Sequence, residues 1–422
     1  MHTIKRLLAF AVKYWQWIAL NVLCMSVVTV VNVMWPQFKR LIIDKCFTAH
    51  HYDLLPYYAM AIIAAVIING VVWFCSLYLT EFIAQKTVYD IRNRLFDHIQ
   101  RLSFSYHDEA ETGQLISRAT SDVDVIRQFL GEGLLHLVMD SMLLIGVIAV
   151  CFYMNWRLAA LALMTLPFLV FSVYKFRSIV GPLFTAVQDQ IGDMTTAIQQ
   201  NLVGIRVVKA FAREDFEVEK FSKQARDLYE KAVAASRVQA KYQPLMDLLA
   251  SSGLVLVLWY GGAQVIGHKH GMTLGMLVAF YEYIAMIVWP VRILGWVVMI
   301  AQWAIASGDR IFEILDTHPE VHLKDGNREL KNCRGAVEFR DVAFSYQDGG
   351  HVLKDVNLTV EPGEMVALVG ATGSGKSTII NLLPRFYDVT AGSLMIDGVD
   401  IREYRVASLR RNIGIVSQET FL

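Results

Sequence analysis

The sequence lacks both a net charge and any metal-type spacing of cysteines. Lysine plus arginine and aspartate plus glutamate each number 39 among 422 residues, so the formal net charge is zero. Without a basic excess, nucleic acid is not expected as a partner. The five cysteines include no C-x-x-C pair, and most lie in or beside apolar segments, so we interpret them as small core residues. They are Cys24, Cys46, Cys75, Cys151 and Cys333.

Charged residues are also scarce. They make up 18% of the chain, against 55% hydrophobic residues, which excludes an ordinary soluble protein. The hydrophobic residues gather in six stretches, and each approaches or exceeds the roughly 20 residues that cross about 30 Å of hydrocarbon. The first stretch has no small-residue cleavage site, so we predict a span and not a signal peptide. The six predicted spans are Trp15–Trp35, Leu54–Thr80, Gly133–Met154, Leu158–Tyr174, Leu248–Ile266 and Met272–Val291.

The connections between the spans differ strongly in length. Asn155-Trp156-Arg157 is the only break between the third and fourth spans, which predicts a tight hairpin. By contrast, residues 81–132 and 175–243 form long connections with helical periodicity, so we expect helices that continue well beyond the bilayer. Lysine and arginine concentrate in these two connections. The positive-inside tendency therefore predicts that both long connections and both termini are cytoplasmic.

Two carboxylates lie inside predicted spans. An acid at membrane depth costs roughly 2.5 to 3.5 kcal/mol on insertion scales, so each must face protein or a wet cavity. Asp140 is near the cytoplasmic end of its span and is interpreted as structural, whereas Glu282 is near mid-membrane. Three successive steps of seven residues after Glu282 reach tryptophans (Trp289, Trp296 and Trp303), which predicts one slowly drifting helical stripe. The stripe is either the wall of a substrate cavity, suited to amphipathic or cationic ligands, or a packing surface with interfacial tryptophan anchors.

A phosphate-binding loop follows the spans. Residues 370–377 read Gly-Ala-Thr-Gly-Ser-Gly-Lys-Ser, a complete G-x-x-x-x-G-K-[ST] motif. The apolar run Glu364–Val369 predicts a buried strand before the loop, and Ser377–Leu383 predicts a helix after it. Glycines let backbone N–H groups form a concave nest at a helix N-terminus, where the dipole favours anions. Because Lys376 can reach the β- and γ-phosphates and the Ser377 hydroxyl can bind Mg²⁺, the pattern predicts a site for ATP and Mg²⁺.

The composition changes after the sixth span, which divides the chain into domains. Strand-like segments begin with Val337–Phe339 and Val342–Phe344. We therefore expect a multi-pass α-helical membrane domain with long cytoplasmic helical extensions, followed by a partial α/β P-loop NTPase domain. The predicted bounds are 1–312 for the membrane domain, 313–334 for a linker and 335–422 for the partial nucleotide-binding domain.

Short motifs throughout the chain resemble those of one transporter family. The matching segments are Leu95–His98, Thr112–Arg118, Gly204–Phe211, Ser307–Asp316, Phe344–Tyr346, Pro362–Glu364 and Ile415–Gln418. Together with the phosphate loop, they resemble the ATP-binding cassette (ABC) exporters in the half-transporter form, with the membrane domain fused ahead of the nucleotide-binding cassette. The resemblance covers essentially the whole chain. The exporters that the chain resembles are of the multidrug and lipid type.

This resemblance implies roles for particular residues. Tyr346 would stack on adenine, Thr378 would help to hold the α-phosphate, and Gln418 of the glutamine loop would approach Mg²⁺ and the γ-phosphate. The segments Thr112–Arg118 and Val207–Asp215 would be coupling helices that rest on the cassettes. The implied nucleotide-binding residues are Tyr346, Gly370, Ala371, Thr372, Gly373, Ser374, Gly375, Lys376, Ser377 and Thr378. The implied Mg²⁺ ligands are Ser377 and Gln418, and the candidate cavity residues are Glu282, Trp289 and Trp296.

The resemblance also implies partners and a location. A second half-transporter chain would complete a homodimer or a heterodimer, and closure of two cassettes on ATP would switch the cavity from inward-facing to outward-facing. The substrate would be a hydrophobic or amphipathic drug or lipid, and peptides and metal conjugates, which exporters of this architecture also handle, stay open. The protein would lie in the plasma or inner cell membrane, in contact with membrane lipid, with its cassette in the cytoplasm.

Part of the family's hydrolytic apparatus has no counterpart in the sequence. After the glutamine loop the family continues with a signature loop, a Walker B Asp and Glu, and a switch histidine. Lys376, Ser377 and Gln418 cover only part of what phosphoryl transfer needs. We therefore expect these 422 residues to be a fragment without hydrolytic competence, whose phosphate-loop strand lacks a sheet neighbour. Two alternatives stay open: an ATP-gated channel or ATP sensor on the same frame, and a non-catalytic chain that depends on an intact partner.

Overall fold

The computed structural model describes residues 2–268, 271–317, 326–346, 350 and 352–416. Contacts divide the chain into two units. The helical unit consists of Met1–Asp90 and Asp124–Gly308, and the cassette unit consists of Ile91–Val123 and Asp309–Leu422. Most of the first long connection therefore belongs to the same unit as the phosphate loop.

Among the described residues, six helical segments are long and apolar enough to cross a membrane, which agrees with the six predicted spans. Several are far longer than the roughly 20 residues that a bilayer requires, since the second has 50 residues and the fifth has 53. The predicted continuation of helices beyond the spans is thus confirmed. The segments are Trp15–Thr48, Tyr52–Arg101, Thr112–Leu163, Leu166–Val203, Glu214–Ile266 and Leu274–Asp316.

These segments are built from long α-helices joined by short helices and wider turns. The longer helices are α1 (His2–Val12), α2 (Trp15–Leu41), α3 (Leu55–Arg101), α7 (Leu134–Leu163), α8 (Leu166–Val203), α10 (Glu214–Leu256) and α12 (Leu274–Asp316). The shorter ones are α4 (Phe104–Glu109), α5 (Thr112–Ser117), α6 (Val123–Gln128), α9 (Ile205–Ala210) and α11 (Gly262–Ile266). Widened π-helical turns cover Ile42–Thr48, Arg118–Asp122, Phe129–Gly133 and Val257–Gly261, and a 3₁₀ turn covers Tyr52–Leu54.

The third and fourth spans meet at a kink inside α7. The backbone of Asn155 is extended (φ −158°, ψ 98°) and interrupts the helix. Its Oδ1 accepts a hydrogen bond from the Leu158 N–H (3.1 Å) and so caps the segment that follows. Its Nδ2 donates to Oε1 of Gln264 (3.0 Å) at the end of the fifth span. The break predicted at Asn155-Trp156-Arg157 is therefore present, and its first residue supplies the cap.

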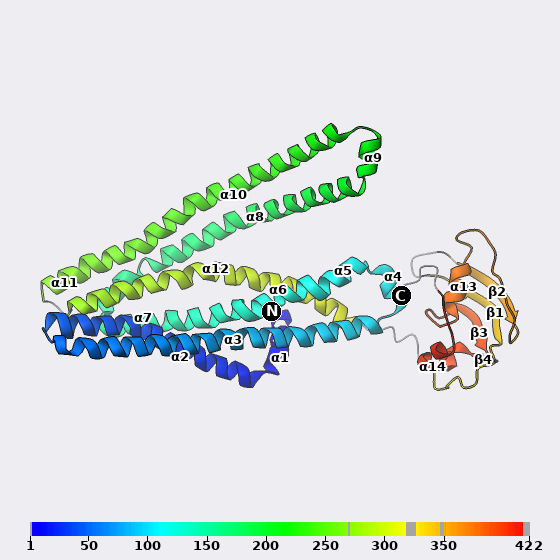
Figure 1. Ribbon diagram of the computed structural model, residues 1–422, viewed down its shortest axis with the longest axis horizontal. Helices are drawn as coiled ribbons and strands as arrows, with labels where there is room; N and C mark the ends of the chain where they lie inside the picture. The colour runs from blue at the N-terminus through cyan, green and yellow to red at the C-terminus, as the bar shows by residue number, and fades with distance from the viewer. Residues whose placement is uncertain (1, 269–270, 318–325, 347–349, 351, 417–422) are drawn as a thin grey trace. The chain divides into compact units, whose positions relative to one another are not determined.

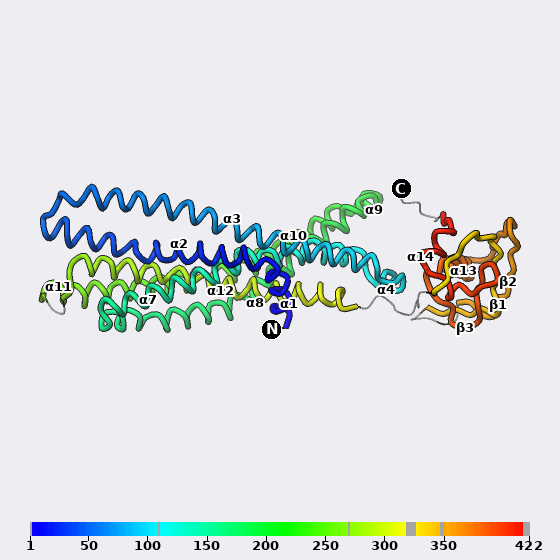
Figure 2. The backbone as a smooth tube through the Cα atoms, turned by 90° about the horizontal axis from the view of Figure 1, so that it is seen from below, coloured from blue at the N-terminus to red at the C-terminus, as the bar shows by residue number. Residues whose placement is uncertain are grey.

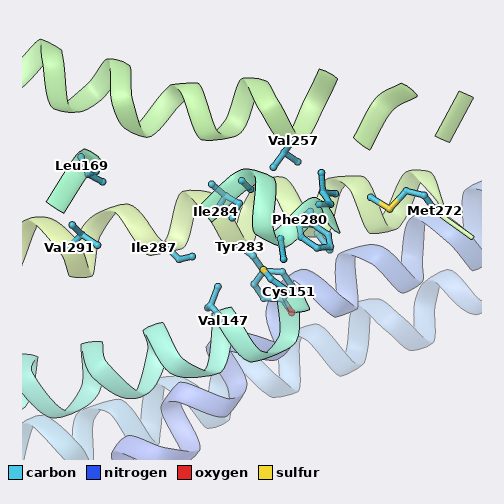
Figure 3. Packing of buried hydrophobic residues seen from close by; sticks show 14 of the residues in the cluster. Val147, Cys151, Leu169, Val257, Met272, Phe280, Tyr283, Ile284, Ile287 and Val291 are labelled. Atoms are coloured by element: carbon cyan, nitrogen blue, oxygen red, sulfur yellow. The ribbon is translucent and has the colours of Figure 1, made fainter. Parts of the chain in front are cut away.

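The core of the helical unit lies between α7 and α12. Val147 and Cys151 of α7 are fully buried, as are Phe280 and Tyr283 of α12. Figure 3 shows these side chains directed toward one another, with Val257 approaching from the opposite side of α12. Cys151 is a free cysteine, like the other four, which agrees with its interpretation as a small core residue. Close packing of this kind, rather than hydrophobic exclusion alone, holds helices together where the surroundings are also apolar.

Polar side chains join α2 to α3. Asn21 donates to Thr80 Oγ1 (2.8 Å) and accepts from Ser76 Oγ (2.9 Å), and all three residues are buried. Further along the same two helices, Asn69 donates to Asn32 Oδ1 (3.3 Å). Figure 2 shows α2 and α3 running side by side. Such bonds stabilise helix pairs in membranes by about 0.6 kcal/mol each on average.

Helices α8 and α10 form a long hairpin, with α9 at its tip (Figure 1). Lys231 of α10 donates to Oε1 of the buried Gln190 of α8 (2.6 Å), which joins the two helices well away from the core. At the tip, Val207 is 60% exposed and Phe211 is 73% exposed. The hairpin thus presents apolar side chains to its surroundings at its far end.

The cassette unit contains a four-stranded antiparallel sheet with the strand order β2-β1-β3-β4. Its strands are β1 (Val337–Phe344), β2 (Leu353–Val360), β3 (Ala391–Ile396) and β4 (Val399–Asp400). The two predicted strand segments lie in the single strand β1, which is interrupted by a register shift between Phe339 and Val342. Phe339, Val342 and Leu394 are buried in the core that the sheet shares with α13 (Lys376–Leu382), the 3₁₀ turn Ile401–Glu403 and α14 (Val406–Arg411).

One predicted element differs in the structure. The run Glu364–Val369 was predicted as a buried strand, but no described residue pairs with it. Met365 is 95% exposed and Val369 is 94% exposed. A strand requires hydrogen-bonding neighbours on the sheet, and the four strands of the described sheet pair only among themselves. The segment is apolar, as predicted. However, an apolar segment is buried only where another element packs against it, and composition does not show whether one does.

The packing of α1 on α12 predicts the effect of a substitution at Gly308. Leu7 of α1 is fully buried, and a Cβ atom on Gly308 would lie 2.7 Å from Thr3 Cγ2 and 3.3 Å from Leu7 Cδ1. We expect Gly308→Val to destabilise the protein by about 1–3 kcal/mol through overpacking. The midpoint of thermal unfolding in detergent, followed by tryptophan fluorescence, measures the loss. Gly181→Val in α8 is the matched control, because nothing lies within 4 Å of that added Cβ. Equal midpoints for the two variants would contradict the contact.

Candidate nucleotide-binding site

Glycines determine the backbone path of the phosphate loop. Gly373 (φ +83°) and Gly375 (φ +87°) both adopt the left-handed conformation, which costs other residues roughly 1–2 kcal/mol. A Cβ on Gly375 would also lie 2.6 Å from Leu353 Cδ2 of β2, so this position excludes a side chain on two grounds. Helix α13 begins directly after it at Lys376 and ends at Leu382, close to the predicted helix.

The ammonium group of Lys376 is held inside the curve of the loop. Its Nζ donates to the carbonyl oxygens of Gly370 (2.8 Å) and Ala371 (2.7 Å) and to Ser374 Oγ (3.3 Å). These three acceptors are neutral oxygens on an exposed loop. Anionic oxygens form stronger bonds with an ammonium group than neutral ones do. The arrangement therefore holds a cation where a phosphate bound by the loop would meet it.

Two predicted nucleotide residues far apart in the sequence lie together. Tyr346 Oη is 3.3 Å from Thr378 Oγ1 in α13. The Tyr346 ring packs edge-on against Phe344 (4.8 Å between centroids) and Tyr387 (5.3 Å), which fixes the ring beside the start of α13. Thr378 itself is buried. The pairing places an aromatic ring next to the phosphate loop, although no local pattern relates β1 to that loop.

The other predicted residues of the loop have simpler surroundings. Thr372 and Gly373 are exposed on the loop, as is Ser377 in the first turn of α13, so the Ser377 hydroxyl is open to a ligand. Gln418 lies outside the described residues.

The predicted cavity residues do not share one environment. Helix α12 continues through Pro290, so the stripe lies on one helix as expected. Glu282 forms an ion pair with Lys39 of α2 at 2.5 Å and is therefore not a lone acid. Trp289 is 63% exposed, whereas Trp296 packs edge-on against the His136 ring of α7 (5.9 Å). His136 in turn hydrogen-bonds to Asp140 (3.2 Å), which agrees with a structural role for that buried acid.

A contact that the sequence analysis missed joins α4 to the sheet domain within the cassette unit. The ring of Phe104 stacks on Phe386 with 3.9 Å between centroids. The Tyr387 hydroxyl donates a hydrogen bond to the Asp108 carboxylate. The only available signal was the aromatic pair Phe386-Tyr387 just after α13. Because Tyr387 also touches Tyr346, the contact connects α4 to the predicted adenine-stacking residue.

Ion pairs tie the same segment to the end of α12. Arg310 binds both carboxylate oxygens of Asp122, one of them at 2.9 Å, and Arg118 lies 3.5 Å from Glu313. Burial raises the pKa of the neighbouring Tyr106 above its ordinary value. The predicted coupling segment Thr112–Arg118 forms the short helix α5 and the residue that follows it. It is thus attached to the helix that leads from the spans into the sheet domain.

Comparison with known protein families agrees with this arrangement. A family profile described as "ABC transporter transmembrane region" matches residues 18–291, which is more than half of the chain. A second profile, described as "ABC transporter", matches residues 353–422. The chain belongs to the ABC transporters. The resemblance drawn from the short motifs is thereby confirmed, and so is the architecture of six spans followed by part of a cassette.

Curated ABC transporters match along the whole chain. The ATP-dependent lipid A-core flippase of Syntrophus aciditrophicus is 35% identical over 422 residues, covering 100% of this chain and 70% of that protein. The flippase of the same name from Desulfotalea psychrophila is 33% identical over 419 residues, covering 99% and 73%. The putative multidrug export ATP-binding/permease protein YgaD of Bacillus subtilis is 33% identical over 429 residues, covering 100% and 74%. The chain thus spans about 70% of the length of these relatives.

The geometry of Gly375 predicts the effect of a substitution on nucleotide affinity. Gly375→Ala forces a left-handed alanine against Leu353, so the loop must leave its present path. We expect binding of a fluorescent ATP analogue to weaken about tenfold, which corresponds to roughly 1.4 kcal/mol of backbone strain. Titration of the 422-residue chain in detergent measures the affinity. Gly414→Ala is the control, because its Cβ meets nothing within 4 Å and its φ is not positive. Unchanged affinity in Gly375→Ala would rule out this loop conformation for the bound state.

Proposed function

We propose that the protein is an ATP-driven exporter subunit. It moves a hydrophobic or amphipathic substrate, a drug or a lipid, out of the cytoplasm or the inner leaflet. The observation that carries this proposal is a chain of contacts inside the cassette unit, which leads from the nucleotide site to the end of α12. Tyr346 touches Tyr387, Tyr387 binds α4, and the segment after α4 is ion-paired to the end of α12. The names of the lipid flippases and of the multidrug export protein support export as the direction and amphipathic molecules as the cargo.

The proposed nucleotide is ATP with Mg²⁺. The residues present fit it, because the left-handed Gly373 and Gly375 curve the loop in front of α13 and Lys376 supplies a cation inside that curve. When bound, Mg²⁺ would neutralise phosphate charge, with Ser377 and Gln418 as its protein ligands. Tyr346 would stack on the adenine, and Thr378 would hold the α-phosphate. Hydrolysis also needs a group that positions water and further charge stabilisation, so we propose that these 422 residues bind ATP without hydrolysing it by the family route.

The proposed partner is a second half-transporter chain. The tip of the α8–α10 hairpin carries apolar side chains that no described residue of the chain covers, including the strongly exposed Val203, Val207 and Phe211. A groove beside them is lined by Val207, Val208, Phe211, Arg213, Phe216 and Glu217. Exposed apolar surface of this kind marks an interaction site. A cassette of the second chain would cover it, and alternating access would follow from closure of the two cassettes.

The proposed location is the plasma or inner cell membrane, with both termini, the hairpin tip and the cassette in the cytoplasm. The support is the concentration of lysine and arginine in the two long connections. The domain bounds 1–312, 313–334 and 335–422 belong to the same proposal. In the structure α12 continues to Asp316, so its last turn enters the proposed linker.

Removal of the loop cation tests the proposal. In the complete gene product, reconstituted in lipid vesicles, we expect Lys376→Ala to reduce ATP-driven movement of a fluorescent lipid about a hundredfold, because a cation at the transferring phosphate is lost. Lys354→Ala on β2 is the matched control and should move lipid like the unmodified protein. ATP-stimulated ion current without lipid or drug movement would instead establish a gated channel. Nucleotide binding without movement of any substrate would leave the role of an ATP sensor.

A further inference from the structure

An ion pair joins two helices of the helical unit, α2 and α12. Nζ of Lys39 in α2 is 2.5 Å from Oε1 of Glu282 in α12. The two side chains remain 46% and 24% exposed, respectively. Both partners can therefore still be reached by a further molecule.

A hydrogen-bonded frame holds the two helices beside this pair. The hydroxyl of Tyr283, the residue after Glu282, donates to the Val33 carbonyl oxygen in α2 (2.6 Å). Gln37 of α2 donates to the same hydroxyl (3.1 Å) and accepts from Arg40 (3.3 Å). Tyr283 is fully buried. The frame fixes the backbones that carry the ion pair, so the two charges are positioned in advance.

The position of the ion pair along its helices limits which molecules it can contact. Glu282 is two turns inside the start of α12 at Leu274, about 12 Å along the helix axis, and lies within the sixth predicted span, whereas Lys39 lies just beyond the end of the first predicted span. Charged groups at that depth face a water-filled path or other protein, because lipid tails do not solvate them. The exposed part of the pair therefore faces either the substrate path or the second chain.

We propose that Lys39 and Glu282 together recognise the headgroup of a zwitterionic amphiphile. This inference rests on the proposed export function and names its substrate class. The headgroup's phosphate or carboxylate would bind Lys39, and its ammonium group would bind Glu282. Every charge then keeps a partner when the ion pair opens around the headgroup.

Singly charged amphiphiles are disfavoured at the same site. An anion that binds Lys39 leaves Glu282 unpaired at membrane depth, and a cation that binds Glu282 leaves Lys39 unpaired. An uncompensated charge on a membrane-spanning helix is unfavourable. The pair thus selects net-neutral headgroups, which differs from the preference for cationic ligands that a lone Glu282 would give.

Trp289 supplies a surface for the rest of the molecule. It lies seven residues beyond Glu282 on α12, nearly two helical turns further along the same face, and is 63% exposed. Its ring can pack against an acyl chain or another apolar group of the substrate. The Lys39–Glu282 pair would contact the polar headgroup of an amphiphile, and the Trp289 ring would contact its apolar part.

Charge-matched lipids test the inference in the complete gene product. The protein is reconstituted in vesicles of uncharged galactolipid that contain traces of one of three lipids with the same dye-labelled tails. The headgroups are phosphocholine (zwitterionic), phosphoglycerol (anionic) and trimethylammonium-propane (cationic). ATP-dependent loss of dye from the outer leaflet, measured by its protection from dithionite, gives each rate. We expect the phosphocholine lipid to move at least about tenfold faster than the other two.

Variants of the pair separate recognition from a structural role. Lys39→Met should shift the preference to the cationic lipid, and Glu282→Gln should shift it to the anionic lipid. The exchanged pair Lys39→Glu/Glu282→Lys should keep the zwitterion preference. Lys39→Met/Glu282→Gln removes both charges, leaves none unpaired, and should lose the discrimination while still folding. Lys13→Met, which breaks the exposed Lys13–Asp90 pair (2.7 Å) outside the spans, should leave the ranking unchanged.

The outcomes distinguish this inference from the export function. Equal rates for the three lipids, or one ranking in all variants, would overturn headgroup recognition by the pair and leave export intact. ATP binding with no movement of any amphiphile would overturn the export function itself, and this inference with it.

Discussion

Inside hydrocarbon, every backbone N–H and C=O group must find its partner within the protein. The helical unit meets this requirement with continuous helices, and even Pro290 leaves α12 unbroken. The kink at Asn155 lies between two spans, where its own side chain caps the next segment. The same helices then run on past the membrane. They carry the hairpin tip at α9 well beyond the length that a bilayer requires.

The same medium forces charges into pairs. Glu282 is matched by Lys39, and Asp140 by His136. The first pair joins α2 to α12 across 243 positions of sequence, whereas the second lies within one turn of α7. A lone acid in a sequence pattern is therefore an incomplete description of a membrane site. Its partner decides whether the site favours a cation, an anion or a molecule that carries both charges.

In the cassette unit, some features follow from a few adjacent residues and others depend on contacts between distant segments. Gly373 and Gly375 need left-handed backbone whatever surrounds them, so the phosphate loop and the helix after it were predictable from a few adjacent residues. Resemblance to a family assigned Tyr346 and Thr378 to the same nucleotide, but their direct contact was not predicted, because the two come from different elements. The stacking of Phe104 on Phe386 was not predicted at all, since neither residue belongs to a periodic pattern. The strand predicted at Glu364–Val369 is not part of the described sheet, because a strand needs a hydrogen-bonded neighbour and local composition does not show whether one is present.

The sequence by itself determined the six spans, the long helical extensions, the phosphate loop and membership of a transporter family. Each depends on composition, on spacing along one helix or on the conformational needs of single residues. Tertiary structure alone decided that Glu282 is paired, that α4 touches the sheet domain and that the α9 tip stays uncovered. These features depend on which surfaces meet, and that is set by the packing energy of distant segments rather than by any local pattern.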